Sequence, residues 1–120
     1  MNKRKIGTVY EDAAAAFLER EGCRILEHGF RCRGGEIDLI ARDGEYLVFA
    51  EVKYRAGKGS GSGPEAVDMR KQLRISRVAL FYLARYQIPP DTPCRFDVIA
   101  IDGGKMRRIR GAFPLHPACR

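Results

Sequence analysis

The chain has 120 residues, of which 45% are apolar and 31% charged, and this balance predicts one soluble globular domain around a single core. Its 22 Lys and Arg residues outnumber 15 Asp and Glu residues, giving a net charge of +7. Such a charge favours a polyanionic partner, nucleic acid first and an anionic membrane surface second, with a merely solvated basic surface as the alternative. No apolar run is long enough for a membrane-spanning helix or a signal-peptide core, so a cytoplasmic location is expected.

The cysteines and histidines lack the spacing of a redox or zinc motif, because no CxxC pair occurs and the histidines lie far apart. They are Cys23, Cys32, Cys94, Cys119, His28 and His116. Free thiols in a reducing compartment are the simplest expectation.

The N-terminal segment is predicted to be a flexible basic tail over residues 1–6, followed by a helix. Thr8-Val9-Tyr10-Glu11 matches a capping box, which predicts Thr8 as the N-cap, and Gly22 is expected to end the helix. Glu11 has two interpretations, a helix cap or an acid turned toward a site elsewhere in the fold. The sequence alone favours the cap.

Residues 35–55 are predicted to form a β-hairpin at the centre of the fold. Residues 37–41 and 46–54 form its strands, and residues 42–45, with Asp-Gly, form its turn. An irregular strand over residues 23–30 is expected before it. Gly34 and Gly35 then allow a close backbone approach or an unusual turn.

Acidic residues interrupt both apolar strands of this hairpin, where they are costly unless paired or bound to a metal. Strand periodicity puts Glu51 and Lys53 on one face, and Glu36 and Asp38 on one face of the partner strand. Two interpretations carry equal weight. Asp38 and Glu51 suit Mg²⁺ or Mn²⁺, with Lys53 orienting a bound water or stabilising charge in the transition state. Alternatively, Lys53 forms a salt-bridge cluster with Glu51 or Asp38.

A Gly/Ser-rich surface loop over residues 56–63 follows and lacks the P-loop pattern. A long helix is predicted over residues 65–86, with a second capping box over residues 62–65. Its apolar face is predicted to contain Ala66, Met69, Leu73, Leu80, Leu83 and Ala84. Arg70, Arg74 and Arg77 form one stripe, with Lys71 nearby, and either contact phosphate or are simply solvated.

The C-terminal third is predicted to contain a turn over residues 88–93, a strand over residues 94–102 and a short basic edge strand over residues 105–110. Residues 112–120 are expected to be irregular, with a flexible end from residue 115. Asp97 interrupts its strand and is a weaker candidate for the same site. A pairing with a nearby arginine such as Arg95 is the favoured interpretation.

The Asp38…Glu51-Val52-Lys53 pattern resembles the Asp…(Asp/Glu)-x-Lys signature of the restriction-endonuclease-like nuclease superfamily. A wider set of segments resembles, in order, the YraN-type family of predicted endonucleases, which is similar to archaeal Holliday-junction resolvases. The segments are GxxxE (residues 7–11), FRxRxGEIDLIA (30–41), VFxEVKxR (48–55) and RFDV (95–98). The resemblance extends from about residue 3 to 114. One departure is Tyr10-Glu11, which stands where the family has a second glycine-glutamate pair.

The resemblance implies an α/β fold, with a mixed central sheet flanked by helices. It implies metal ligation by Asp38 and Glu51, with Lys53 as the catalytic lysine. It also brings Glu11 from the first helix toward the site, and by analogy Lys71 or Gln72 from the long helix. Related resolvases act as dimers, so a homodimer is expected.

These observations predict a metal-dependent endonuclease of DNA, including branched or recombination-type DNA, that uses Mg²⁺ or Mn²⁺. The first alternative is a nucleic-acid-binding module with the same fold and little or no catalysis. The second is a structural or adaptor protein whose basic face binds protein or RNA. The residues expected to contact nucleic acid are Arg31, Arg33, Arg55, Lys58, Arg70, Lys71, Arg74 and Arg77.

Overall fold

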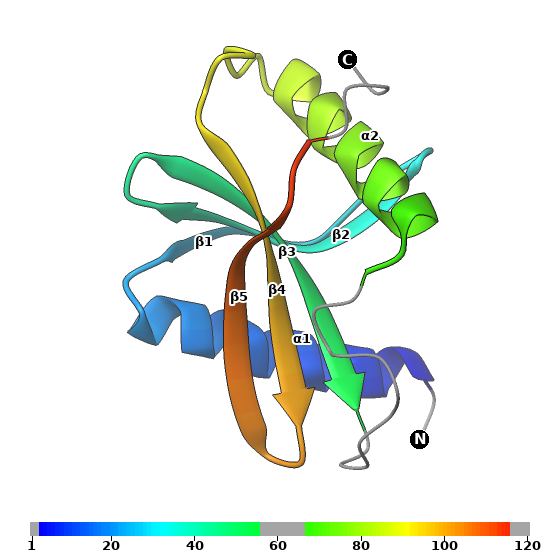
Figure 1. The fold of residues 1–120 in the computed structure, drawn as a ribbon, viewed down its shortest axis with the longest axis vertical. Helices are drawn as coiled ribbons and strands as arrows, with labels where there is room; N and C mark the ends of the chain where they lie inside the picture. Colours follow the sequence, from blue (N-terminus) through cyan, green and yellow to red (C-terminus); the bar gives the residue numbers. More distant parts are fainter. Residues whose placement is uncertain (1–2, 56–66, 116–120) are drawn as a thin grey trace.

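A computed structural model describes residues 3–55 and 67–115, with the backbone alone for residues 3–7 and 55. Two helices and five strands follow in the order α1 (Lys3–Arg20), β1 (Arg24–Cys32), β2 (Gly35–Asp43), β3 (Tyr46–Arg55), α2 (Met69–Arg85), β4 (Cys94–Asp102) and β5 (Lys105–Phe113) (Figure 1). The strands form one sheet in the order β1-β2-β3-β4-β5. β3 and β4 run parallel, and the other neighbouring pairs are antiparallel. The predicted α/β class, with a mixed sheet flanked by helices, is confirmed.

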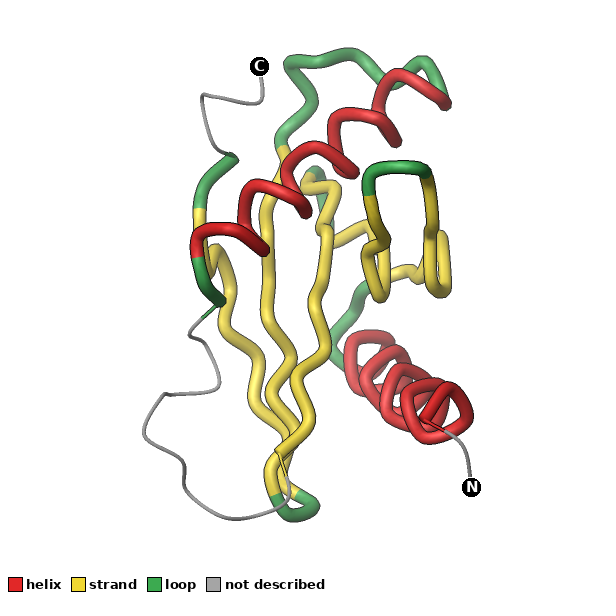
Figure 2. Tube along the Cα trace, turned by 90° about the vertical axis from the view of Figure 1, so that its right-hand side faces the viewer, coloured by secondary structure: helices red, strands yellow, loops and turns green. Residues whose placement is uncertain are grey.

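The two helices cover opposite faces of the sheet (Figure 2). Strand periodicity explains this: Leu47 and Phe49 of β3 face α2, whereas Val48 and Ala50 face α1. The α1 side is built largely from small side chains, and Ala14 and Ala15 of the helix are buried there. The α2 side instead contains most of the aromatic rings, including Tyr82 packed edge-on against Phe49.

The sheet divides at Asp38. β2 pairs with β3 from Asp43↔Tyr46 to Leu39↔Ala50, where the pairing ends. At the next position a side chain replaces the backbone as the acceptor, because Asp38 Oδ2 accepts a hydrogen bond of 2.8 Å from the Val52 N–H. β1 and β2 continue together beyond this point, and the end of their hairpin lies against α2 (Figure 2).

Gly35 allows this close approach of the hairpin to α2. Its φ is +141°, and a Cβ placed there would lie 3.0 Å from Cγ and Cδ of Arg74. Both the conformation and the space therefore require glycine. Of the two alternatives expected at Gly34-Gly35, a close approach is found at Gly35, whereas a Cβ at Gly34 would meet nothing within 4 Å.

The predicted start of α1 is wrong. The helix begins at Lys3, so residues 3–6 are helical rather than a tail, and Thr8 is not the N-cap. The physical reason is that Lys3, Arg4 and Lys5 are good helix formers, and Gly7 within a helix costs only about 1 kcal/mol. Residues 1 and 2 lie outside the described part of the chain.

The predicted start of α2 is also wrong. The N-cap is Asp68, whose side chain accepts a hydrogen bond of 2.9 Å from the Lys71 N–H. Val67 and Asp68 are not helical, so the helix does not run on from Glu65. The capping box over residues 62–65 and the glycine-rich loop over residues 56–63 lie outside the described residues.

The predicted apolar face of α2 is partly wrong. Met69 is 56% exposed and Ala84 is exposed, whereas Ile75, Val78 and Tyr82 are buried. Of the predicted residues that the structure describes, Leu83 is buried, and Leu73 and Leu80 are half-buried. The inward face of α2 is set by the apolar series Ile75, Val78, Ala79, Tyr82 and Leu83, all of which are buried.

The other elements follow the predictions closely. The central hairpin is confirmed, with Gly44 at a φ of +60° in its turn. β1 and β5 are longer than predicted, and β5 includes Ala112 and Phe113, which were expected to be irregular. Phe113 is buried and stacks on Phe96. Cys23, Cys32 and Cys94 are free thiols, and Cys119 and His116 lie outside the described residues. Neither helix in the described part of the chain has the length and apolarity needed to span a bilayer.

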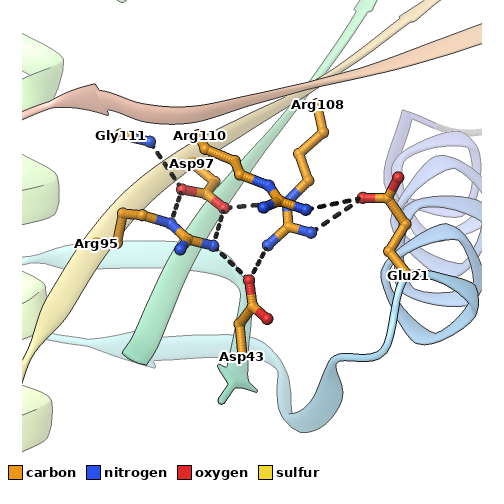
Figure 3. Close-up of polar contacts among 7 residues, drawn as sticks. All are labelled: Glu21, Asp43, Arg95, Asp97, Arg108, Arg110 and Gly111. Carbon is orange, nitrogen blue, oxygen red and sulfur yellow. Dashed lines mark hydrogen bonds and ion pairs between the residues drawn. The ribbon is translucent and has the colours of Figure 1, made fainter. Parts of the chain in front are cut away.

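A buried network of acids and arginines joins β4, β5, the end of β2 and the segment after α1 (Figure 3). Asp97 is 0% exposed, and its carboxylate accepts hydrogen bonds from Arg95, Arg108 and the Gly111 N–H at 2.9 to 3.2 Å. Asp43 accepts from the same two arginines at 2.7 and 2.8 Å. These arginines hold the pKa of Asp43 below its usual value. The favoured interpretation of Asp97, as a partner of Arg95, is confirmed.

Replacing Asp97 with Ala should lower the free energy of unfolding by about 3–5 kcal/mol, because two guanidinium groups would lose a fully buried partner. Urea unfolding followed by circular dichroism measures this change. The matched control is Asp91→Ala at an exposed turn, expected within about 0.5 kcal/mol of wild type. Equal stability of the two variants would contradict the structural role of the network.

Candidate functional site

A cavity of about 570 Å³ lies between the end of the β1–β2 hairpin, the second half of β3 and the first turns of α2. Four basic and three acidic side chains contribute to its lining. The lining residues are Arg31, Cys32, Arg33, Gly35, Glu36, Asp38, Glu51, Val52, Lys71, Arg74 and Ile75. The division of the sheet at Asp38 creates this space, because β2 leaves the plane of β3 there.

Asp38 is fixed by the backbone of the neighbouring strand. Its hydrogen bond from Val52 holds one carboxylate oxygen between β2 and β3, so Asp38 interacts with groups from both faces of the sheet. Burial raises the pKa of Asp38 above its usual value, against the opposing effects of the Val52 hydrogen bond and of Lys71.

Glu51 faces α2 and is only 6% exposed. Its carboxylate forms an ion pair with Lys71 from the first turn of α2. Burial and the nearby Asp38 carboxylate nevertheless raise the pKa of Glu51 to about 7. Burial disfavours the charged form of Lys71, but Glu51 and Asp38 outweigh this effect and raise the Lys71 pKa.

Glu11 approaches Asp38 from the α1 face. Partial burial and the charges of Asp38 and Glu36 raise the pKa of Glu11 to about 7. A Cβ added to Gly29 would lie 3.9 Å from Glu11 Oε1, so β1 also passes close to this carboxylate. The cap interpretation of Glu11 is wrong, because α1 begins eight residues earlier, at Lys3. The structure instead brings Glu11 to the acidic group.

Cationic side chains line the walls of the cavity. Arg31, on the hairpin wall, pairs with Glu36 at 2.9 Å and is 62% exposed. Arg74, on the α2 wall, packs over Gly35 and faces outward. Together with Arg33 and Lys71 these residues surround the carboxylates with positive charge.

The structure does not bring every predicted residue to this cavity. Lys53 is half-buried on β3, two residues beyond Glu51, and Arg70 and Arg77 are exposed on α2. None of these three is among the described residues that line the cavity. Gln72 donates a 2.6 Å hydrogen bond to the Val67 carbonyl at the start of α2. The side chain of Arg55 and the whole of Lys58 lie outside the description.

The sequence interpretation missed two features of the site. One is the ion pair between Glu51 and Lys71, since the sequence interpretation considered only Lys53 as a salt-bridge partner of Glu51. The signal that could have identified it is Asp68, a good N-cap residue three positions before Lys71, which fixes where the first turn of α2 lies. The other is Glu36, which the sequence placed on one face with Asp38 but which was not among the predicted site residues, and which lines the cavity.

The donor set fits a hard divalent cation bound in part by the protein. Among residues 3–55 and 67–115 no cluster of three or more His, Cys, Asp or Glu residues forms a complete metal cage. Mg²⁺ rarely uses such a cage, since it keeps several waters and takes one or two carboxylates together with phosphate oxygens. Asp38 and Glu51 supply two carboxylates, and burial is the main reason that both have raised pKa values.

The fold and the cavity together define an α/β protein with one buried and one half-buried carboxylate in a cleft lined by four cationic side chains. This chain belongs to the uncharacterised protein family UPF0102, whose family model matches residues 10–101. The resemblance to the YraN-type family is thereby confirmed.

Curated relatives carry the family name alone and cover nearly the whole chain. The UPF0102 protein of Lachnoclostridium phytofermentans is 45% identical over 94% of this chain and 96% of its own length. That of Symbiobacterium thermophilum is 50% identical over 89% of this chain and 90% of its own length. Among solved structures, SfsA of Pyrococcus furiosus in complex with Ca²⁺ is similar, with a TM-score of 0.39 and 15% identity over 85% of this chain and 61% of that one.

The stability of the metal-free protein should fall as pH rises from about 4.5 to about 7. The pKa of Glu51 is near 7 when folded and near its ordinary 4.5 when unfolded, so the folded state binds this proton more tightly. This contribution is fully present below about pH 4.5 and is lost as pH rises through about 7, a change on the order of 1–3 kcal/mol.

Thermal unfolding in EDTA across this pH range measures the effect. The variant Glu51→Gln should flatten the curve and melt at a higher temperature than wild type at pH 7.5, whereas Glu45→Gln, on the exposed hairpin turn, should behave as wild type. A wild-type curve that is already flat between pH 5 and pH 7.5 would contradict the described electrostatics.

Proposed function

We propose that this protein is a metal-dependent nuclease that hydrolyses phosphodiester bonds of DNA. One observation carries the proposal: two interacting carboxylates, the half-buried Asp38 and the buried Glu51, line a cavity that four cations also line. The cations would bind the phosphate backbone. The acids repel phosphate by themselves, so their presence in a phosphate-binding cleft is best explained by a divalent cation between them and the substrate.

Asp38 and Glu51 would hold Mg²⁺ or Mn²⁺, and the bound ion would supply an activated water and stabilise charge on a phosphoryl oxygen. The chain's own residues would do the remaining work. Arg31, Arg33 and Arg74 would position the phosphates along the cleft. Glu11, with a pKa of about 7, can exchange a proton near neutral pH from the α1 side.

Two lysines are candidates for the catalytic cation. The resemblance to the nuclease family assigns this role to Lys53, which follows Glu51 by two positions on β3. The geometry adds Lys71, whose ammonium group contacts Glu51 and lines the cavity. We propose that Lys53 stabilises the transition state, and that Lys71 exchanges its contact with Glu51 for one with the substrate phosphate.

A binding module without catalysis is the second candidate, and the Lys71–Glu51 ion pair favours it. In that case the lysine would neutralise the acid permanently and no cation would be needed. The homodimer and the cytoplasmic location expected from the sequence remain predictions.

Cleavage assays separate these two functions. Labelled linear duplex, single strand, flap and four-way junction should be cut in Mn²⁺ or Mg²⁺ and left intact in EDTA. Asp38→Asn and Glu51→Gln should each lower the rate at least about 100-fold, since each removes a metal ligand, while Glu45→Gln retains the wild-type rate. Equal cleavage rates for Glu51→Gln and wild type would contradict the assignment of the metal ligands. Salt-sensitive binding with no cleavage of any substrate would favour the binding module.

The cavity also distinguishes between neighbouring arginines on α2. Arg74→Ala should weaken DNA binding and reduce the slope of log K against log salt by about 1, because one phosphate contact is lost. Arg77→Ala is the matched control, because Arg77 is exposed on the same helix and does not line the cavity. Fluorescence anisotropy at several salt concentrations measures both slopes. Identical slopes for the two variants would contradict the position assigned to the phosphate backbone.

A further inference from the structure

Two tyrosines form a stacked pair at the end of β3, outside the cavity. Tyr10 of α1 and Tyr54 of β3 lie with their ring centroids 3.9 Å apart and their planes at 18°. A side-chain hydrogen bond with Tyr54 raises the pKa of Tyr10, so the two hydroxyl groups also lie together. We refer to Tyr10 and Tyr54 as the tyrosine platform.

The platform is at the surface. Tyr54 is 49% exposed although Tyr10 already covers part of its ring, and the neighbouring Val9 is 57% exposed. Packing between α1 and β3 explains the covered part of Tyr54 and leaves the exposed half without a role. An aromatic ring held in place by a second ring, with half of its surface open, is prepared to stack on another flat group.

The platform adjoins the candidate active site along the chain on both sides. Tyr10 directly precedes Glu11, and Tyr54 directly follows Lys53. Tyr54 is three residues beyond Glu51 on β3, a distance of about 10 Å along the strand, and it faces α1 whereas Glu51 faces α2, so the base and the phosphate would lie on either side of the edge of β3. The pairing of β2 with β3 ends at Ala50, so no paired strand lies between the cavity and the platform along this edge of β3.

We propose that the tyrosine platform stacks an unpaired nucleobase of the strand whose phosphate lies in the cavity. This inference rests on the proposed function, since it takes the cavity as the phosphate site. It makes the substrate a DNA with unpaired nucleotides beside the cleaved bond, such as a single strand, a flap or an opened junction. In an intact duplex each base is already stacked between its neighbours and offers no free face.

Charge and ring chemistry together favour a nucleobase as the occupant. The chain has a net charge of +7, and the adjoining cavity contributes four cations for the backbone phosphates. Proteins that bind single strands combine these two features, a basic groove for the backbone and aromatic rings for successive bases. Such stacking tolerates any base, because every base has a π face.

Binding of fluorescein-labelled oligonucleotides tests the proposal. An oligothymidylate, an abasic strand of the same length and charge, and a blunt duplex are compared in EDTA and in Ca²⁺. Tyr54→Leu should weaken oligothymidylate binding roughly 5- to 100-fold, and abasic binding by less than about 2-fold, because the abasic strand has no base to stack. Tyr54→Phe should retain oligothymidylate binding, because it keeps the ring.

The matched control is Tyr46→Leu, which removes a 38% exposed tyrosine from the opposite end of β3. It should bind all three ligands as wild type does. Thermal melts of the two Leu variants show whether each is folded, and rescue by Tyr54→Phe separates loss of the ring from loss of structure. Equal oligothymidylate affinity for Tyr54→Leu and wild type, or equal losses on the oligothymidylate and the abasic strand, would overturn the proposal.

The same strands incubated with Mn²⁺ and with the Glu51→Gln variant separate this inference from the proposed function. Binding that depends on the Tyr54 ring, without metal-dependent cleavage, would support the stacking proposal and contradict the proposed nuclease activity. Metal-dependent cleavage, with binding that does not depend on the Tyr54 ring, would support the proposed nuclease activity and contradict the stacking proposal.

Discussion

The hydrogen bond from the Val52 N–H to the Asp38 carboxylate determines the form of this molecule. It satisfies a backbone donor that β2 would otherwise satisfy, so β2 can leave β3 while no buried N–H is left unpaired there. The departure of β2 carries the β1–β2 hairpin toward α2 and opens the cavity between them. The same bond fixes the carboxylate that the proposed chemistry needs, so the strand division and the site have one cause.

Two groups of acids in this chain illustrate how a structural cluster differs from a functional one. Asp43 and Asp97 share two arginines, and those arginines hold the pKa of Asp43 below its usual value. At the cavity, burial raises the pKa values of Asp38, Glu51 and Glu11, and the charge of Asp38 raises those of Glu51 and Glu11 further. The first group is neutralised within the protein. The second keeps unfavourable negative charge, and such groups cluster at functional sites.

The sequence predicted the central hairpin and its two acids because both depend on local rules. Alternation and an Asp-Gly turn define the hairpin, and Asp38 and Glu51 stand out because each interrupts an apolar strand. The pairing of Arg95 with Asp97 followed from their spacing of two on one strand. The Lys71–Glu51 pair could not be found in this way, because it depends on where α2 starts and how it crosses the sheet. The deep burial of the Arg108 side chain could not be predicted either, because a basic run such as residues 105–110 normally indicates a solvated edge strand.

The central claim is that Asp38 and Glu51 form a divalent cation site, and calorimetric titration of Mn²⁺ at pH 7.5 tests it most directly. We predict one Mn²⁺ bound per chain, with partial proton release on binding because the Glu51 pKa of about 7 leaves a fraction of that carboxyl group protonated at pH 7.5. The binding signal should be lost in Asp38→Asn and Glu51→Gln but not in Glu45→Gln. Mn²⁺ binding of unchanged strength in both site variants would contradict it, and so would a wild-type protein that binds no Mn²⁺ with or without DNA.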